Sequence, residues 1–321
     1  MRVYFYLICV FFLVSCSELK DTKTLTLAHS LPISHPVHKG IVVFQQELAK
    51  ASKGKLTVKI YPDGQLGGER EALELLQIGS IAMTKVSAAT MANFVPEYGA
   101  VSIPYIFRDK EHCFKVLEGD IGKTLLAKGD DRWLRGLCFY DAGARSFYTV
   151  NKPLNSAEDV KGLKIRVMND PTAVKMVSAL NASPTPMAYG ELYTALQQGV
   201  VDGAENNIPS FVTSRHFEVC KHYSYDEHTY IPDVLIIGTK TLERLSEQEK
   251  RWVYKAANTS AQAQKKFWEA SVNQGLSIIE KAGVHIYRPD KAPFREKTQL
   301  IIEEFKKKSF GNLVEAIQNT K

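Results

Sequence analysis

The feature that most constrains the fold is a regular alternation of short apolar segments with helical segments of roughly 10–15 residues. Runs that favour strands are each followed by a stretch with apolar residues at helical spacing. Strands are expected at 24–28, 56–61, 81–87 and 136–140, and helices at 37–52, 68–79 and 110–127. This alternation predicts an α/β sheet that is covered by helices on both faces.

The alternation is interrupted at Ala142-Gly143-Ala144 and then resumes, with strands expected at 146–150, 163–167 and 234–238. We interpret this as a chain that leaves one domain near residue 143, builds a second and returns near residue 230. Domain I would comprise 24–143 and 231–268, and domain II would comprise 144–230 and 269–321. Two crossings between the domains predict a hinge with a cleft beside it.

Residues 247–282 read as one long helix. A capping box, Ser246 with Glu249, opens the segment, which contains no proline and only one glycine, Gly275. Such a helix would be about 54 Å long, longer than one domain needs, and its apolar positions do not form one stripe. A helix that bridges both domains fits this pattern; two helices broken near Asn258 or Gly275 are the alternative. A last helix is expected at 293–320.

The first residues resemble an export signal. Arg2 precedes an apolar run of 12 residues, Val3 to Val14, which is too short to span a bilayer. The run ends in Leu-Val-Ser-Cys, similar to the lipobox of bacterial lipoproteins. We predict that 1–15 are a signal peptide, that Cys16 is lipidated and anchors the protein to a bacterial membrane in the periplasm, and that 16–23 form a tether. An ordinary secretory signal is the alternative.

Composition and motifs exclude several functions. The net charge of +6 is spread along the chain, so nucleic-acid binding is not expected. Cys113, Cys138 and Cys220 have no CxxC spacing, which leaves three buried thiols or one disulfide. His35 and His38 could share a metal with His29, but no acid or cysteine lies at ligand spacing, so no metal is predicted. Without a GxSxG, HExxH, P-loop or GxGxxG motif, we expect no cofactor and no catalysis.

The residues favour binding of a small carboxylate. Arg166 ends a strand beside a helix start, Asn169-Asp170-Pro171, where an anion is favoured; a surface ion pair is the alternative. Arg145 follows the break between the domains, and Asn206 and Asn207 follow a strand and can donate and accept hydrogen bonds. Two further candidates are an aromatic floor for a sugar-sized ligand, Tyr189, and an acid that opens a helix, Glu69.

Four segments resemble the solute-binding proteins of TRAP transporters, the DctP family. They are LKIRVMN (163–169), ASPTPMAYGELYTALQQGVVDGAENN (182–207), YPDGQLGGERE (61–71) and IPYIFRD (103–109). The resemblance covers about 24–310. It implies a two-domain periplasmic-binding-protein-like α/β fold with a hinged cleft and a long helix that bridges both domains. It also implies closure over an organic acid and delivery to a membrane permease made of a small and a large TRAP subunit.

The same resemblance assigns roles to residues. It implies that Arg166 clamps the carboxylate, that Arg145 assists, and that Asn206, Glu69 and Tyr189 contact the ligand. Members that bind sialic acid carry Glu and Asn where this chain has Ser87 and Ser30, which disfavours sialic acid. GAENN, HPVHKG and DEHTYIPDVL are similar to members that bind hexuronates. On that similarity, further candidates for hydroxyl contacts are His29, Lys39, Asn207 and Asp233.

The sequence therefore predicts a binding protein for a sugar acid, D-glucuronate or D-galacturonate. Another small organic acid, a C4-dicarboxylate or 2-oxo acid, is the alternative, because it needs fewer hydroxyl partners. An enzyme acting on sugar acids and a lipoprotein that reports ligand occupancy to a sensor are alternatives from other classes.

Overall fold

The computed structural model describes residues 22–321, so the predicted signal peptide, Cys16 and most of the predicted tether lie outside the described residues. Within residues 22–321, no helix is both long enough and apolar enough to cross a membrane. The three cysteines of this part of the chain are buried, free thiols, as one of the two sequence-based alternatives expected.

Five strands form the first sheet, in the order β2-β1-β3-β10-β4. They are β1 (Lys23–Ala28), β2 (Leu56–Tyr61), β3 (Met83–Ser87), β4 (Leu134–Tyr140) and β10 (Asp233–Gly238). β1 is parallel to β2 and β3, whereas β10 is antiparallel to β3 and β4. The associated helices are α1 (Pro36–Ala51), α2 (Glu69–Ile78), α3 (Ala88–Met91), η1 (Pro96–Ser102), α4 (Lys110–Glu118), α5 (Asp120–Ala127), η2 (Asp130–Arg132) and α9 (Thr239–Glu243).

Six strands form the second sheet, in the order β11-β9-β5-β8-β6-β7. They are β5 (Ala144–Thr149), β6 (Lys164–Val167), β7 (Ser183–Pro186), β8 (Gly203–Asn206), β9 (His222–Tyr230) and β11 (His285–Tyr287). β6 is parallel to β7 and β8, and β5 is antiparallel to β8 and β9. The associated helices are η3 (Ala157–Val160), α6 (Pro171–Ala179), η4 (Tyr189–Glu191), α7 (Leu192–Gln197), α8 (Ile208–Thr213), η5 (His216–Glu218) and α11 (Ala292–Lys306), and α11 is followed by α12 (Gly311–Asn319).

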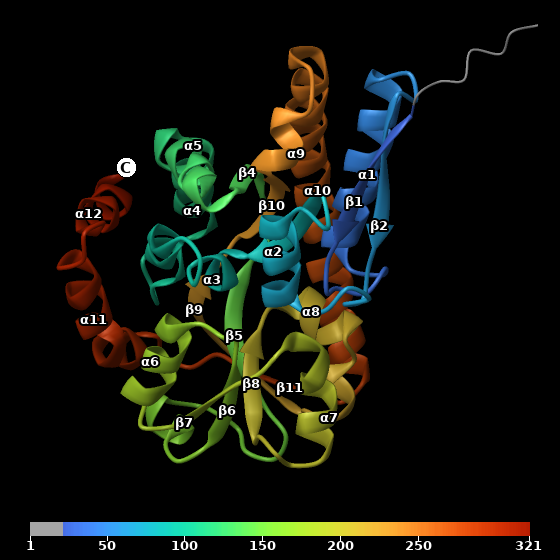
Figure 1. The fold of residues 1–321 in the computed structure, drawn as a ribbon. Helices are drawn as coiled ribbons and strands as arrows, with labels where there is room; N and C mark the ends of the chain where they lie inside the picture. The colour runs from blue at the N-terminus through green and yellow to red at the C-terminus, as the bar shows by residue number, and fades with distance from the viewer. Residues whose placement is uncertain (1–21) are drawn as a thin grey trace, which may run out of the picture.

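Two strand-to-strand crossings join the sheets, which lie one above the other in Figure 1. β4 runs into β5, and β9 runs into β10. The first crossing needs a glycine: Gly143 has φ +57°, and a Cβ there would lie 2.9 Å from Nε1 of Trp268. Because β5 and β10 run against their neighbours, the carboxyl ends of β1, β3 and β4 face those of β6 and β8 across the junction.

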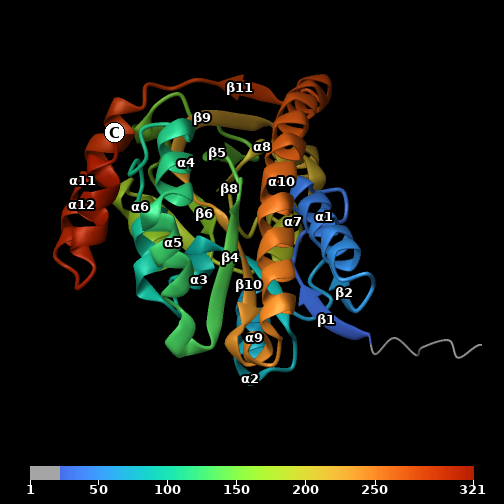
Figure 2. The ribbon, with the colours of Figure 1, turned by 90° about the horizontal axis from the view of Figure 1, so that it is seen from above.

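A third connection is α10 (Glu247–Lys281), a single helix of 35 residues that begins with the predicted capping box at Ser246. The alternative of two broken helices is therefore wrong. α10 packs on α1 near its middle, where a Cβ on Gly40 would lie 2.7 Å from Cβ of Gln264. Farther along α10, a Cβ on Gly275 would lie 2.6 Å from Cγ2 of Ile208 in α8. α10 changes partners along its length, as Figure 2 shows, and this confirms the predicted α/β fold with a long bridging helix.

Two predicted helices are each broken in two. The helix expected at 110–127 divides at Gly119, whose extended backbone (φ −80°, ψ −167°) ends α4 before α5 begins. A Cβ on Gly122 would lie 1.8 Å from the carbonyl oxygen of Leu117, which shows how tightly the chain turns. The helix expected at 293–320 divides before Gly311, where a Cβ would lie 1.9 Å from the carbonyl oxygen of Lys306.

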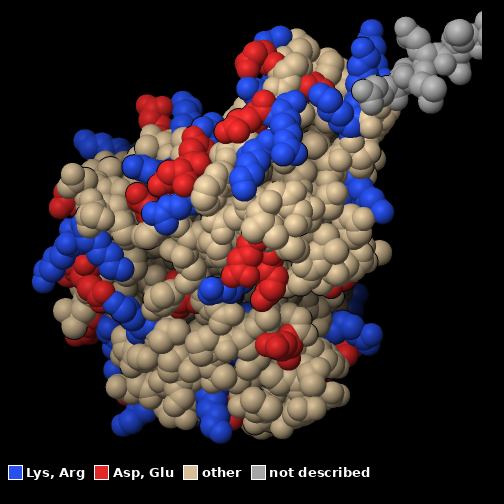
Figure 3. All heavy atoms as spheres, viewed as in Figure 1, with Lys and Arg blue, Asp and Glu red and all other residues tan. Residues whose placement is uncertain are grey.

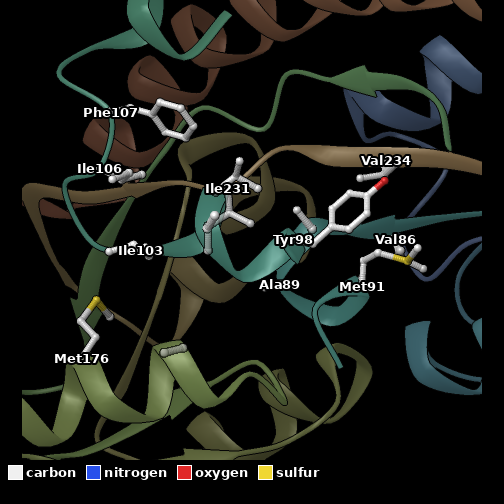
Figure 4. Packing of buried hydrophobic residues seen from close by; sticks show 14 of the residues in the cluster. Val86, Ala89, Met91, Tyr98, Ile103, Ile106, Phe107, Met176, Ile231 and Val234 are labelled. Carbon is white, nitrogen blue, oxygen red and sulfur yellow. The ribbon is translucent and has the colours of Figure 1, made fainter. Parts of the chain in front are cut away.

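A continuous apolar cluster joins the two halves on one side of the junction. Figure 4 shows Met176 of α6 below Ile103 and Ile106, with Ile231 and Tyr98 farther along the same cluster. α12 lies against the first half, where Nη2 of Arg108 donates to the carbonyl oxygen of Thr320 at 2.7 Å. The residue boundaries of the two domains stay a prediction.

Candidate functional site

A cavity of about 280 Å³ lies where the strand ends of the two sheets meet. It is close to the lower end of the range for small-molecule pockets, roughly 300–1,000 Å³, and so suits a ligand of sugar size. Its walls come from both halves, and one wall includes the start of α2 at Glu69, Arg70 and Glu71. In Figure 3, acidic side chains gather over α2 in the middle of the face shown.

Arg166 is the most unusual residue of this cavity. Its side chain is 2% exposed, and its Nε and Nη2 donate to the carbonyl oxygen of Met187 at 3.2 and 2.8 Å. Its Nη1 is buried without a hydrogen-bond partner, and no acidic side chain within residues 22–321 forms an ion pair with it. Burial lowers the pKa of this guanidinium. A buried cation without a counterion is costly, so the site favours an incoming anion.

Arg145 is buried in the same cavity but is already neutralised. Its Nε and Nη2 donate to the two carboxylate oxygens of Glu205, at 2.5 and 2.9 Å, and its Nη1 donates to Oδ1 of Asn206 at 2.8 Å. This two-pronged pair holds the guanidinium rigidly. The two predicted arginines therefore differ in charge balance, although both line the cavity.

A buried histidine extends the Arg145–Glu205 pair. Nδ1 of His228 lies 2.6 Å from Oδ2 of Asp226, and its Nε2 lies 3.4 Å from Oε2 of Glu205. Burial opposes ionisation of both Glu205 and His228, but the charged neighbours prevail. Arg145 and His228 lower the pKa of Glu205 to about 2, and Asp226 and Glu205 raise the pKa of His228 to about 9.

The cavity wall from the first sheet contains a lysine between two acids. Nζ of Lys85 lies 3.1 Å from Oε1 of Glu69 and 3.2 Å from Oδ2 of Asp233. Glu69 also accepts hydrogen bonds from the backbone N–H of Ser87 and, at 2.7 Å, from the hydroxyl of Thr90. The Ser87 hydroxyl caps α3 by accepting from the N–H of Ala89.

Three other predicted residues reach the cavity in different ways. The Tyr189 ring lies 5.7 Å from Cζ of Arg166, and its hydroxyl is 2.7 Å from Oγ of Ser214. Asn206 uses Oδ1 within the protein, while its Nδ2 donates to no group among the described residues, which leaves it for a ligand. Asn207 lines the cavity, but its side chain is occupied: it caps α8 and donates to the carbonyl oxygen of Ala142 at 3.0 Å.

His29 and Lys39 do not line this cavity, and their contact with a ligand stays a prediction. The His29 ring is buried against His38, with Nε2 3.0 Å from Nδ1, and burial lowers its pKa to about 3. Lys39 lies exposed on α1. His35 reaches the cavity instead and bonds Oγ of Ser210, so these histidines do not converge; within residues 22–321 no three metal-ligating side chains gather.

Sequence reasoning missed several lining residues, of which Lys85 is the most informative. It stands in a fully buried strand, MTKVS, and a lysine flanked by apolar residues in such a strand signals a buried charge with partners. The others carried no motif of their own; they are His35, Ser210, Trp268 and the carbonyl group of Met187.

Comparison with known proteins identifies the family of this chain. A family model described as bacterial extracellular solute-binding protein, family 7 (DctP), matches residues 27–308. A Salmonella typhimurium protein, uncharacterized protein YiiZ, is 39% identical over 291 residues, 90% of this chain and 89% of its own. The C4-dicarboxylate-binding periplasmic protein DctP of Rhodobacter capsulatus is 31% identical, over 84% of this chain and 81% of its own.

Solved structures match equally well. A TRAP periplasmic solute-binding protein from Bradyrhizobium sp. BTAi1, in complex with α/β-D-galacturonate, is 40% identical with a TM-score of 0.90, and the match covers 92% of this chain and 100% of that one. A protein of the same class from Roseobacter denitrificans, with bound β-D-glucuronate, is 35% identical with a TM-score of 0.89, covering 93% and 100%.

Replacing each arginine by methionine should change stability in opposite directions. Arg166→Met removes an uncompensated buried cation, so the free energy of unfolding should stay the same or rise. Arg145→Met leaves Glu205 buried without its main partner, so the free energy of unfolding should fall by about 3–5 kcal/mol. Urea unfolding measures both. Equal losses would show that Arg166 has a structural partner.

His228 should make stability fall between pH 6.5 and 9. Its folded-state pKa of about 9 lies above the unfolded value of 6.5, so its contribution is complete below pH 6.5 and is lost as the pH rises toward 9. The contribution is on the order of 3 kcal/mol. Thermal unfolding across this range should show the slope, and His228→Gln should flatten it, whereas the exposed control His285→Gln should keep it. If the decrease of stability between pH 6.5 and 9 persists in His228→Gln, another titrating group causes it.

Proposed function

Because this chain belongs to the DctP family of bacterial extracellular solute-binding proteins, we propose that it captures a hexuronate, D-galacturonate or D-glucuronate, and delivers it to the membrane subunits of a TRAP transporter. One observation carries this proposal: the buried Arg166 guanidinium has an unpaired Nη1 and no counterion among the described residues. A ligand carboxylate would supply the missing charge and the missing acceptor.

Arg166 would hold the carboxylate in a charge-assisted pair. Arg145, kept in place by Glu205, would direct its guanidinium edge toward the same ligand without adding a net charge. Closure of the two halves around the ligand would exclude water and strengthen these bonds. The predicted domain division, with its crossings near 143 and 230, supplies the hinge for this closure.

The ligand's hydroxyl groups would meet the other polar groups of the cavity. Asn206 offers a free amide donor, while Glu69 and Asp233 offer carboxylate acceptors. The Tyr189 ring would lie against the apolar face of a sugar ring. These partners are more numerous than a C4-dicarboxylate would use. The dicarboxylate remains the second candidate, because a 31% identical relative carries that name.

We further propose that the protein is exported, lipidated at Cys16 and held at a membrane in the periplasm, beside the small and large TRAP subunits. The apolar run before Cys16 and the Leu-Val-Ser-Cys pattern support this. Labelled fatty acid should be incorporated by the wild-type chain and not by Cys16→Ser. Incorporation by both would refute lipidation at this residue. We propose no catalysis.

A thermal-shift panel tests the ligand. It would contain hexuronates, aldonates, C4-dicarboxylates, 2-oxo acids and sialic acid. A ligand at 100 times its Kd should add about 2.7 kcal/mol to the free energy of unfolding. We expect galacturonate or glucuronate to give the largest shift.

Two variants locate the carboxylate. Arg166→Met should abolish the shift in a folded protein, because the ligand loses its only unpaired cation. Lys50→Met removes an exposed cation outside the cavity and should leave the shift unchanged. Turnover of a uronate, no shift with any organic acid, or near-native binding by Arg166→Met would each contradict the proposal.

A further inference from the structure

The charges of the cavity wall are unevenly distributed between the two halves. Four acidic side chains line the cavity, and all belong to elements of the first half: Asp63, Glu69, Glu71 and Asp233. The second half contributes Arg145 and Arg166. The acidic lining side chains therefore lie on one side of the cavity, and the unpaired guanidinium of Arg166 lies on the other.

Only one of the lining cations is free of an acidic partner within residues 22–321. Arg145 is paired with Glu205, and Arg70 donates to Glu74 at 3.1 Å. Lys85 is shared between two carboxylates. Arg166 alone has no ion pair, so the site can neutralise one ligand carboxylate and has no second cation to offer.

Lys85 keeps the anionic wall in a fixed arrangement. Its side chain is 1% exposed, and strand pairing places Asp233 opposite Ser87, one diagonal step from Lys85. Burial opposes the charge on Lys85, yet Asp233 and Glu69 raise its pKa. For Glu69, burial opposes ionisation, but Lys85 and hydrogen bonds from Thr90 and Ser87 lower the pKa. Lys85 and Glu69 are therefore both charged at neutral pH.

With Lys85 charged and Glu69 ionised, the charges of Lys85, Glu69 and Asp233 sum to −1 or zero, depending on Asp233. With both acids ionised the net charge is −1, and with Asp233 protonated, as its burial favours, it is zero. A ligand hydroxyl can donate to a carboxylate of this wall, whereas a second ligand carboxylate would find repulsion and no unpaired cation.

We propose that Lys85, Glu69 and Asp233 are a specificity element that admits acids with one carboxylate and excludes diacids of the same carbon chain. This inference rests on the proposed function and deepens it. Arg166 takes the single carboxylate, and the two acids accept hydrogen bonds from hydroxyls at the other end of the ligand. Lys85 acts as a positioning residue, because it aligns both carboxylates without contacting the ligand.

The test compares galacturonate with galactarate, which has the same six carbons but a carboxylate at both ends. Calorimetry with the exported wild-type protein should show galacturonate binding at least roughly 100-fold more tightly. Glu69→Gln and Asp233→Asn each remove one negative charge at nearly constant shape. Each should weaken galacturonate binding and reduce the preference over galactarate at least tenfold. The matched control Glu47→Gln, outside the cavity on α1, should leave the preference unchanged.

Lys85→Met gives a readout that a purely structural role would not produce. Without the lysine, Glu69 and Asp233 should share a proton, and a protonated carboxyl can donate to a second ligand carboxylate. The preference for galacturonate should then fall as the pH is lowered from 8 to about 5, and it should fall less in the wild type, where Lys85 disfavours protonation of both acids. If Lys85→Met does not fold, the Glu69→Gln and Asp233→Asn variants alone test whether these residues set the preference for galacturonate.

The outcomes separate the two proposals. If wild-type protein binds neither acid nor any other hexuronate, the proposed function fails. If galacturonate binds but galactarate binds equally well, or if the preference is unaltered in both acidic-residue variants, the specificity element is refuted and the proposed function stands.

Discussion

The structure depends on one unfavourable interaction, the burial of the Arg166 guanidinium without a counterion. Such a charge is retained only where the surrounding fold is stable enough to hold it. Here the carbonyl oxygen of Met187 fixes two of its nitrogens and leaves the third unpaired. Under the proposed function, relief of that cost would contribute to the affinity for an anion.

The topology places this arginine at a junction rather than inside one domain. β4 passes directly into β5 and β9 into β10, and α10 runs alongside as a third connection. Because the carboxyl ends of strands from both sheets face each other there, residues distant in sequence share one cavity. Gly143 allows the first crossing to pass close to Trp268 of α10. Hinge, bridging helix and cavity are thus parts of one arrangement.

The other two buried cations of the cavity, Arg145 and Lys85, are each neutralised by acidic side chains. Glu205, supported by His228, compensates Arg145, and Glu69 with Asp233 compensates Lys85. Each of these cations is held by acids on its own side of the cavity. Among the lining residues described in the structure, the cation without an acidic partner is the guanidinium of Arg166.

Local sequence determined much of this protein. Period-two and helical spacing predicted most strands and helices, and the capping box at Ser246 predicted where α10 begins. Strand pattern and family motifs predicted a carboxylate site at Arg166; the structure shows that this residue is buried at the cavity, and its role stays a prediction. These features depend on residues within a few positions of one another, and such short-range effects can be read from one chain.

Tertiary structure alone decided the charge balance. Arg145 and Arg166 look equivalent in sequence, and only long-range pairing shows that Glu205 neutralises Arg145, while no acidic side chain among residues 22–321 forms an ion pair with Arg166. The breaks at Gly119 and Gly311 follow from close backbone approaches, and the contact between His29 and His38 is likewise a product of the fold. Lys85 gained its partners from β10 and α2, elements that folding brings beside it. Ion pairing and burial depend on distances across the fold, which spacing along the chain does not contain.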